Sequence, residues 1–485
     1  MGIDEGSLGN FLEYMRKTAN KVKGVVEGAH AVVVTHYDAD GLSSAAIIAK
    51  MLQRLGTTFH IRVVEQVDQS ILTDLSELDY DVFIFTDMGS GAFDFISKII
   101  SRQNIIIIDH HPPLKNRNNT AGRLIEINPF IFGIDGSSNS SASTLSYLLS
   151  KNIDKRNTSL APLAIVGAVG DRQDMGEYYS LKGLNKIAVE DGIKRGYLKV
   201  EMGLRLFGIR SKPLVSCLEN TMDPFLPGLT GNEGACLLFL KKIGVEPVEE
   251  GRLKTYSMLS EEEKKRLATE LVKYLLSKGF SAKMAESIFG TMYFLTQEDV
   301  NSPLYDAREY ATVLNACGRL EHYSIAIALG LGYRGKVLQK ALDDFLQYKK
   351  LLSTVLNKLR QNEKRIINME HVLVVDARGL IPPKVAGSLA SILASSRIFN
   401  ADKPLLVVAG KGKLKISMRQ PAKLRKIYYG IHLGEILHHA ANKTGGMGGG
   451  HAMAAGGTIF DGGFERFLNV LNEVIGWRIK GFKNV

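Results

Sequence analysis

The chain has 485 residues, of which 45% are hydrophobic and 23% charged, a balance typical of a soluble globular protein with two or three domains. Lys and Arg number 61 against 50 Asp and Glu, and the resulting net charge of +11 suits a polyanionic partner without proving one. The three cysteines form no metal-type pair, which excludes a zinc knuckle and a disulfide framework and indicates a reducing compartment.

The N-terminal stretch "FLEYMRKTANKVKGVVEGAH" is charged and amphipathic and contains no long apolar run. We therefore expect neither a signal peptide nor a membrane span, and we expect a cytoplasmic protein.

From Ala31 onward, short β-branched runs alternate with helical spacing. Buried strands separated by helices predict a parallel sheet covered on both faces, that is, an α/β domain over residues 1–200. The segment "LAIVGAVGD" (163–171) fits a strand or a helix and ends in an acid. The expected strands are 31–35, 59–64, 81–86 and 104–109, and the expected helices are 42–56, 70–78 and 92–101.

The rest of the chain changes character twice. Residues 201–335 are rich in Lys, Glu and Leu and predict a mainly helical insert. The absence of Gly and Pro from Lys336 to Arg378 predicts a long linker helix, which we place at 336–369. Strand patterns return in 370–485, which predicts a smaller C-terminal α/β domain containing the glycine-rich "TGGMGGGHAMAAGG".

Acids and histidines lie where the predicted strands end. In a parallel sheet the carboxyl ends of neighbouring strands share one edge, so we expect these side chains to converge there. They are His36, Asp38, Asp40, Asp87, Asp109, His110, His111 and Asp171.

Close carboxylates repel one another, and divalent cations remove that repulsion. Oxygen ligands with imidazoles favour Mn²⁺ or Mg²⁺ over thiol-preferring metals. Several acids with a bridging candidate predict two ions roughly 3.5–4 Å apart, the arrangement that hydrolyses phosphate esters.

Simpler interpretations explain less of the pattern. If "DADG" belonged to an EF-hand, Ile47 would occupy the position that requires Glu, so that interpretation fails. An acid after a strand is often only a helix N-cap, which explains one such acid better than five together with "DHH". We interpret His60, His322 and His371 as structural or surface residues.

The set "THYDADG", "FTDMG", "IDHHPP", "GAVGD" and "GGGHAMAAG" resembles the DHH phosphoesterase superfamily with its C-terminal DHHA1 domain. "INPFIFGIDGSSNSSAS" and "REYATVLNACGR" are similar to segments of the archaeal RecJ-like exonucleases, including the GINS-associated nuclease. Tyr37 departs from the usual polar residue at a position that is not a ligand, and no expected acid is missing.

The resemblance implies metal ligands at Asp38, Asp40, Asp87, Asp109, His110 and Asp171, with Asp87 as the bridge. His36 and His111 belong to the motifs, and each would either ligate a metal or hydrogen-bond the phosphate. The family implies cleavage of single-stranded DNA or RNA from an end, with a role in replication or repair.

The C-terminal half is expected to hold the substrate. From Lys403 to Gly434 there is no acid but eight Lys or Arg, and alternation in "KGKLKISMRQ" places the cations on one face of a strand. Such a face is a solvated surface or, as we favour, a track for a phosphate backbone with Tyr428 and Tyr429 beside it. With the resemblance, the expected substrate-binding residues are Lys415, Ser417, Arg419, Gly449, Gly450 and His451.

The leading interpretation is therefore a metal-dependent single-strand exonuclease. One alternative is a replication scaffold that binds GINS and the MCM helicase, since the family is related to the eukaryotic cofactor that joins them. Another is a nanoRNase-type phosphodiesterase acting on oligonucleotides of a few units.

Overall fold

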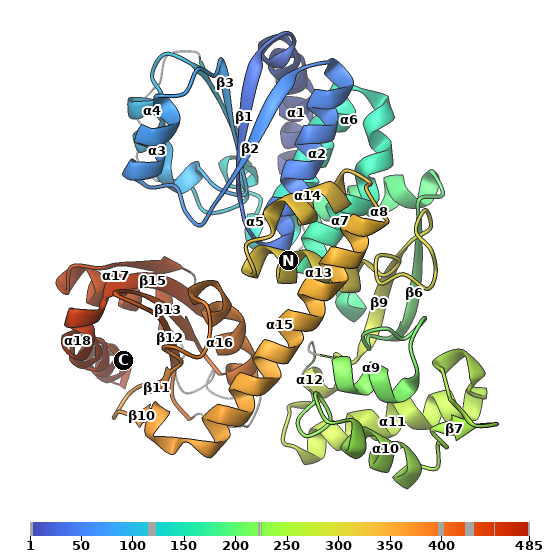
Figure 1. Ribbon diagram of the computed structural model, residues 1–485. Coiled ribbons are helices and arrows are strands. Elements are labelled where there is room, and N and C mark those ends of the chain that lie inside the picture. The colour runs from blue at the N-terminus through green and yellow to red at the C-terminus, as the bar shows by residue number, and fades with distance from the viewer. Residues whose placement is uncertain are drawn as a thin grey trace. The chain divides into compact units, whose positions relative to one another are not determined.

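The computed structural model describes residues 3–114, 123–221, 224, 226–395, 402–421, 431–450 and 452–483 (Figure 1). The chain divides into two compact units. The N-terminal unit comprises Met1–Pro213, Thr255–Met258 and Ser287–Phe345. The C-terminal unit comprises Leu214–Lys254, Leu259–Glu286 and Leu346–Val485.

The N-terminal unit contains a five-stranded parallel sheet with the strand order β2-β1-β3-β4-β5. β1 lies between β2 and β3, so the chain builds first toward one edge of the sheet and then toward the other. This arrangement confirms the predicted α/β class, with β5 as a strand that the sequence pattern did not reveal. The strands are β1 His30–His36, β2 Thr58–Val64, β3 Val82–Thr86, β4 Asn104–Ile108 and β5 Leu124–Ile127.

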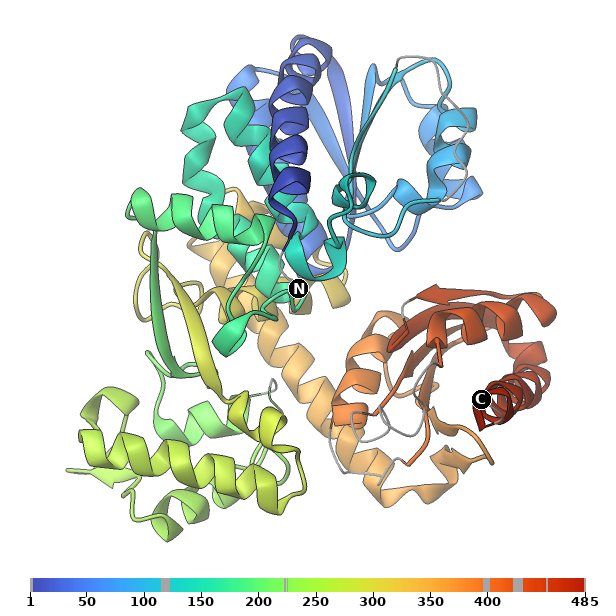
Figure 2. The same ribbon diagram turned by 180° about the vertical axis from the view of Figure 1, so that it is seen from behind.

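Helices cover both faces of this sheet: α3 and α4 lie on one face, and α1, α2 and α6 lie on the other (Figures 1 and 2). Val32, Val34, Phe83 and Phe85 point toward α3 and α4 because alternate strand residues face opposite sides. In the segment 163–171, which the sequence left open, residues 163–170 lie in helix α7 and Asp171 is its C-cap. The helices are α1 Glu5–Val26, α2 Ala39–Leu55, α3 Gln69–Ser76, α4 Phe93–Ile99, α5 Gly136–Asn139, α6 Ala142–Ile153, α7 Ala161–Gly170 and α8 Leu184–Lys194.

Residues 287–335, which the sequence placed in the insert, belong to the N-terminal unit. The antiparallel strands β6 (Leu198–Leu204) and β9 (Phe289–Leu295) pair there. Helix α13 (Ala307–Arg319) packs against α7 and α2 through an apolar face, and α14 (Tyr323–Gly330) packs on α2. Residues 287–335 belong to the N-terminal unit because the apolar face of α13 is buried against α7 and α2.

The insert itself is mainly helical, as expected. Its longest helix, α11, begins with a capping box in which Ser260 and Glu263 bond each other's backbone N–H groups. The elements are α9 Leu214–Asn220, α10 Glu233–Lys242, β7 Val248–Glu249, β8 Arg252–Leu253, α11 Glu261–Ser277 and α12 Ala282–Glu286.

The C-terminal unit also holds a six-stranded mixed sheet with the order β10-β11-β12-β13-β15-β14. Its apolar core lies against α17 and α18, and α16 packs on the opposite face (Figure 2). The elements are β10 Ile366–Asn368, β11 Leu373–Asp376, α16 Ala386–Ser395, β12 Leu405–Lys411, β13 Lys413–Arg419, α17 Leu433–Lys443, β14 Met447–Gly450, β15 Ala454–Phe460 and α18 Phe464–Lys483.

The long helix α15 covers Lys336–Gln361, and the division between the units falls within it, after Phe345. The expected linker helix ran to residue 369, but Ile366–Asn368 already forms β10, because Ile366 and Ile367 pair with β11. Among the described residues, no helix combines the length and the apolar content needed to cross a membrane.

Candidate metal centre

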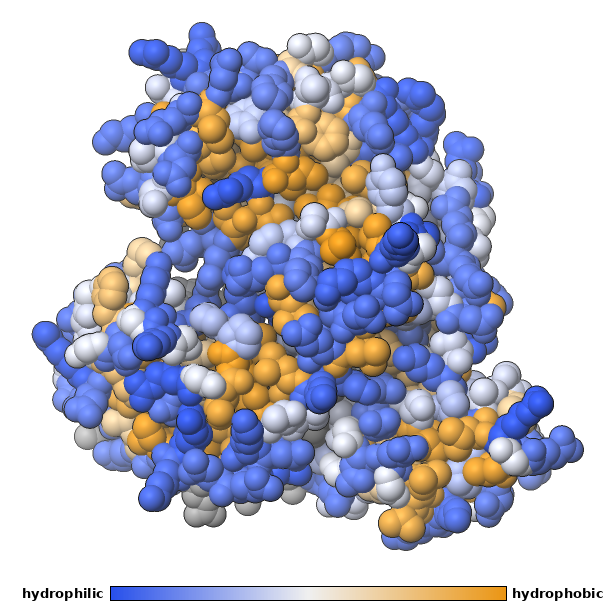
Figure 3. All heavy atoms as spheres, viewed as in Figure 1, coloured by the Kyte–Doolittle hydropathy of each residue, from blue (hydrophilic) through white to orange (hydrophobic). Residues whose placement is uncertain are grey.

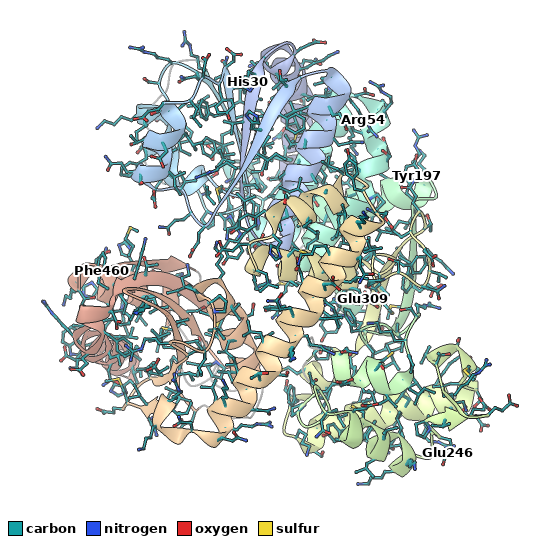
Figure 4. All side chains as sticks on the ribbon, in the orientation of Figure 1. His30, Arg54, Tyr197, Glu246, Glu309 and Phe460 are labelled. Carbon is teal, nitrogen blue, oxygen red and sulfur yellow. The ribbon has the colours of Figure 1, made fainter. Side chains whose placement is uncertain are left out.

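Acidic and imidazole side chains converge at the carboxyl edge of the parallel sheet, at the ends of the neighbouring strands β1 and β3. The chain continues from β1 to β2 on one side and from β3 to β4 on the other. His36 ends β1, Asp87 follows β3, and Asp171 follows α7. His30, labelled in Figure 4, begins β1 and therefore lies at the other end of the strand from the cluster. Parallel α/β sheets bind ligands at such an edge.

Three groups of side chains place their ligand atoms within 4.8 Å of one another. Asp87 belongs to two of these groups, as does His110, so these two residues link the cluster. The groups are His36, Asp38 and Asp87; Asp87, His110 and His111; and Asp40, His110 and Asp171.

His110 lies at the centre of the cluster with its Nε2 atom buried and without a hydrogen-bond partner. This nitrogen is 3.3 Å from Asp87 Oδ1, 3.8 Å from Asp40 Oδ2 and 3.7 Å from Asp171 Oδ2. Its other nitrogen, Nδ1, is 3.1 Å from the carbonyl oxygen of Gly136. A ring held in this way presents its Nε2 lone pair to the carboxylates, as a metal-ligating histidine does.

Backbone N–H groups fix the carboxylates of Asp38 and Asp40. Asp38 is the N-cap of α2 and accepts from the N–H of Gly41 at 3.0 Å. Asp40 accepts from the N–H groups of Ala142 (2.7 Å) and Ser143 (2.9 Å) at the start of α6. The simple N-cap interpretation therefore holds for Asp38 in part, and the same carboxylate still faces His36 Nδ1 at 3.0 Å.

Asp109 is placed differently from the other acids. Its Oδ1 accepts from His111 Nδ1 at 2.8 Å, and its Oδ2 accepts from the N–H of Ser90 at 3.0 Å. Its position in the cluster is that of a carboxylate that orients His111, and it belongs to none of the three close groups. Metal ligation by Asp109 stays a prediction.

The backbone at Asp87 adopts an uncommon conformation. Asp87 has a φ of 61°, in the left-handed region that L-residues other than Asn and Asp rarely adopt. Its N–H still donates to the carbonyl of Ile108 at 2.9 Å, which ties the turn to the sheet. Residues other than glycine in this region are concentrated at functional sites, where the surrounding structure holds them in place.

Crowding changes the protonation of the cluster. Burial raises the pKa of Asp40 to about 6, and burial together with the charge of Asp38 raises the pKa of Asp87 well above its usual value. Burial also opposes ionisation of Asp38, but the His36 imidazole outweighs it and lowers the pKa of Asp38. Burial lowers the pKa of His111, but the Asp109 carboxylate outweighs it and raises this pKa to about 9.

These residues fit a divalent cation. In the described part of the chain, the ion pairs of Asp38, Asp40 and Asp87 all go to imidazoles and none to a lysine or arginine. The orphaned Nε2 of His110 and the carboxylate oxygens around it form a mixed oxygen and nitrogen donor set, which suits Mn²⁺ or Mg²⁺.

Helix α13 supports the loop after β1, a contribution that the sequence reasoning missed. Asn315 Oδ1 accepts from the N–H of Ala39 at 3.1 Å, between the two acids of "DADG". At Gly318, an added Cβ would lie 1.8 Å from the carbonyl oxygen of Tyr37, so only glycine permits this approach. Both residues lie in "REYATVLNACGR", the segment noted above only for its similarity to RecJ-like proteins.

The expected substrate residues lie in the C-terminal unit. Leu414, Ile416 and Met418 face the core under α17 and α18, so Lys413, Lys415, Ser417 and Arg419 share the face of β13 that carries α16. Arg419 Nε donates to Ser391 Oγ of α16 at 3.0 Å, and Arg419 Nη1 donates to Ser417 Oγ at 3.2 Å.

One detail of the basic strand differs from the expectation. Lys411 ends β12 and Lys413 begins β13, because Gly412 (φ 72°) forms the turn between them. Lys411 is therefore paired opposite Lys413 rather than following it along one strand. Tyr428, Tyr429 and His451 lie outside the described residues, as do three cations of the basic run, Lys423, Arg425 and Lys426.

The glycine-rich segment places backbone without side chains beside Ser417. The register pairs Ser417 with Gly456 and Gly456 with Gly449, so these three residues form one row across β13, β15 and β14. A Cβ at Gly449 would meet nothing within 4 Å. Gly450 has a φ of 134°, which requires glycine, and it ends β14.

Comparisons with known proteins agree with this architecture. A model of the DHH family N-terminal domain matches residues 30–168, a DHH-CID domain model matches 206–289, and a DHHA1 domain model matches 370–476. The uncharacterized protein MJ0831 of Methanocaldococcus jannaschii is 31% identical over 453 residues, covering 92% of this chain and 94% of that protein. The chain therefore belongs to the DHH family of phosphoesterases.

Solved structures share the fold. CDC45 from Entamoeba histolytica aligns with a TM-score of 0.63 at 14% identity, covering 98% of this chain and 100% of that one. RecJ from Thermus thermophilus, in complex with Mn²⁺, aligns with a TM-score of 0.56 at 20% identity over 95% of this chain. Because 54% of that RecJ is covered, the chain spans about half its length.

Proposed function

We propose that this chain is a divalent-metal-dependent exonuclease that hydrolyses phosphodiester bonds of single-stranded DNA or RNA from an end. The observation that carries the proposal is the convergence of Asp40, Asp87 and Asp171 on the buried, orphaned Nε2 of His110. Buried carboxylates in such a cluster repel one another and lose hydration, and bound cations offset both costs.

The protein side of the chemistry follows from the three close groups. Asp87 would be shared between two cation positions, one completed by His36 and Asp38, the other by His110 with Asp40 and Asp171. Bound Mn²⁺ or Mg²⁺ supplies Lewis acidity, which activates water and polarises the phosphoryl oxygens. The backbone donors to Asp38 and Asp40 hold their oxygens in place without any rearrangement at the moment of reaction.

The β13 face of the C-terminal unit is the proposed grip on the nucleic acid. Lys413 is exposed there, and Lys415 and Arg419 are partly exposed beside the glycine row. Cations on a strand face bind a phosphate backbone without reading its sequence, which is what an enzyme that degrades strands needs.

The decisive experiment compares Asp87→Ala and Asp109→Ala with the exposed-acid control Asp74→Ala on end-labelled single-stranded DNA and RNA with Mn²⁺. We expect both site variants to lose at least about 1,000-fold in nucleotide release, and we expect the control to retain it. Substrates labelled at either end also report the polarity of cleavage. Full activity in both site variants would refute the assignment.

A second candidate function is scaffolding of GINS and the MCM helicase, for which the insert offers an apolar surface that a protein partner could cover. A groove of about 420 Å³ lies between α10 and α11, and Leu238 at its rim is 71% exposed. Figure 3 shows apolar side chains on the surface of this region. A pull-down with purified GINS, using the wild type and Leu238→Asp, tests it; we expect capture to weaken while nuclease activity stays unchanged.

A further inference from the structure

Gln173 is a completely buried polar residue directly behind the metal centre. Its Nε2 lies 3.0 Å from Asp171 Oδ2 and 2.9 Å from the carbonyl oxygen of Gly136, the same oxygen that His110 Nδ1 approaches. One amide therefore contacts a proposed ligand and the anchor of a second one.

The direction of this amide is fixed by a chain of hydrogen bonds that starts from a backbone group. The N–H of Ser141 can only donate, and it donates to Asn185 Oδ1 at 3.0 Å; Thr144 Oγ1 donates to the same oxygen at 2.7 Å. The other end of the Asn185 amide is therefore Nδ2, which donates to Gln173 Oε1 at 2.9 Å. Gln173 must then present its NH₂ group to Asp171.

The same assignment shows which hydrogen bond His110 Nδ1 makes. The two hydrogens of Gln173 Nε2 go to Asp171 Oδ2 and to the Gly136 carbonyl, so the 3.3 Å approach to His110 Nδ1 is a contact and not a hydrogen bond. His110 Nδ1–H donates to Gly136, which leaves Nε2 as the nitrogen that faces the carboxylates.

The start of α6 thus holds two ligands by two routes. It holds Asp40 directly through the N–H groups of Ala142 and Ser143. It holds Asp171 indirectly, because Ser141 orients Asn185, and Asn185 orients Gln173.

We propose that Gln173 is a positioning residue of the metal centre and that Asn185 sets the direction of its amide. The inference rests on the proposed metal-dependent function. Groups that hydrogen-bond metal ligands from behind fix the ligand orientation, and their loss typically weakens metal binding by about 10–100-fold.

The test measures Mn²⁺ affinity by calorimetry on metal-stripped full-length protein, at a temperature where every variant is folded. Gln173→Met removes the hydrogen bonds at similar volume, and Gln173→Glu turns an acceptor toward Asp171. We expect both to bind Mn²⁺ about 10–100-fold more weakly than the wild type. The matched control, Gln53→Met, changes an exposed glutamine of α2 and should leave the affinity unchanged.

Asn185→Asp provides a second, independent variant. It keeps the acceptor for Ser141 and Thr144 but cannot donate to Gln173, so the Gln173 amide should flip and turn its Oε1 toward Asp171. We expect a loss of Mn²⁺ affinity of the same order, although Asn185 touches no proposed ligand. A purely structural role would lower the melting temperature and leave the affinity of the folded protein unchanged.

Two outcomes overturn the inference in different ways. If the wild type binds Mn²⁺ and the Gln173 and Asn185 variants bind it equally well, the inference fails and the proposed function stands. If the wild type takes up no Mn²⁺, the metal centre is refuted and the positioning role falls with it.

Discussion

Two buried clusters of acids lie in the N-terminal unit, and they resolve the same electrostatic problem in different ways. The cluster at the sheet edge gathers acids around imidazoles. The second cluster lies at the start of α13 and comprises Asp174, Asp306 and Glu309; Figure 4 labels Glu309. Both sets of carboxyl groups are largely removed from water, so both need compensation.

In the second cluster, arginines and backbone N–H groups supply part of the compensation. Asp174 pairs with Arg205 at 2.5 Å and also with Arg308. Asp306 caps α13 by accepting from the N–H of Arg308 at 2.8 Å, and Glu309 accepts from the N–H of Gly208 at 2.6 Å.

Protonation completes that compensation. Burial raises the pKa of Asp306 to about 7, and burial and the neighbouring Asp306 raise the pKa of Glu309 well above its usual value. Guanidinium groups carry a permanent charge and neutralise an acid inside the fold, whereas imidazoles with a free lone pair can share a cation with it. The chemistry of the neighbours, rather than the number of acids, distinguishes a structural cluster from a candidate metal centre.

Removal of Asp174 should break the arginine cluster. Asp174→Ala leaves the buried guanidinium of Arg205 without its carboxylate, and we expect the free energy of unfolding to fall by about 3–5 kcal/mol. Urea unfolding in EDTA measures this, with Asp74→Ala as the exposed-acid control. A loss as small as that of the control would show that the two clusters do not differ as described.

Metal addition should act on the other cluster alone. At a free Mn²⁺ concentration about 100 times the dissociation constant, we expect the wild type to gain about 2.7 kcal/mol in unfolding free energy. Asp87→Ala should gain little, because Asp87 belongs to two of the three close groups. Thermal unfolding with and without EDTA gives the comparison, and equal gains in both proteins would contradict it.

The support from α13 can be loosened without touching an acid. Gly318→Ala places a Cβ 1.8 Å from the carbonyl oxygen of Tyr37, so helix and loop must separate. We expect a stability loss of about 1–3 kcal/mol together with weaker Mn²⁺ binding. Gly24→Ala in α1 is the matched control, because a Cβ there meets nothing within 4 Å. Unchanged Mn²⁺ affinity in Gly318→Ala would show that the helix does not support the site.

The arginine cluster should also show a pH dependence of its own. The folded pKa of Asp306 lies above its usual value, so its protonated form stabilises the fold at low pH, and this contribution is lost as the pH rises through about 7. Asp306→Asn keeps the helix cap and stays neutral, so between pH 6 and 7 its unfolding free energy should fall by about 1 kcal/mol less than that of the wild type. Urea unfolding at the two pH values in EDTA measures the difference, and parallel profiles would count against it.

The position of the candidate site was predictable because it follows from chain geometry. Apolar strands that each end in an acid share one sheet edge, and His36, Asp38, Asp40, Asp87 and His110 do meet there. The α/β class was equally predictable from buried strands alternating with helices. The strand β5 was not predictable. Its sequence "LIEI" is short, and it includes the acid Glu126, which is buried and accepts a hydrogen bond from Ser90 Oγ.

What the sequence could not reveal are contacts between distant segments. Nothing in the spacing of "REYATVLNACGR" indicates that Asn315 reaches Ala39. Gln173 looks like an ordinary polar residue after a helix until Asn185 is placed beside it. Local pattern determines where strands end, but tertiary packing determines which polar groups hold the ligands.

The placement of α13 has a consequence for the timing of synthesis. The acids of the sheet edge emerge early from the ribosome, but the helix that braces their loop is encoded only after the whole insert. A nascent chain therefore carries the ligands for a long interval before the bracing helix can dock. The candidate metal centre would thus be completed late, once α13 has been synthesised and can dock on the loop.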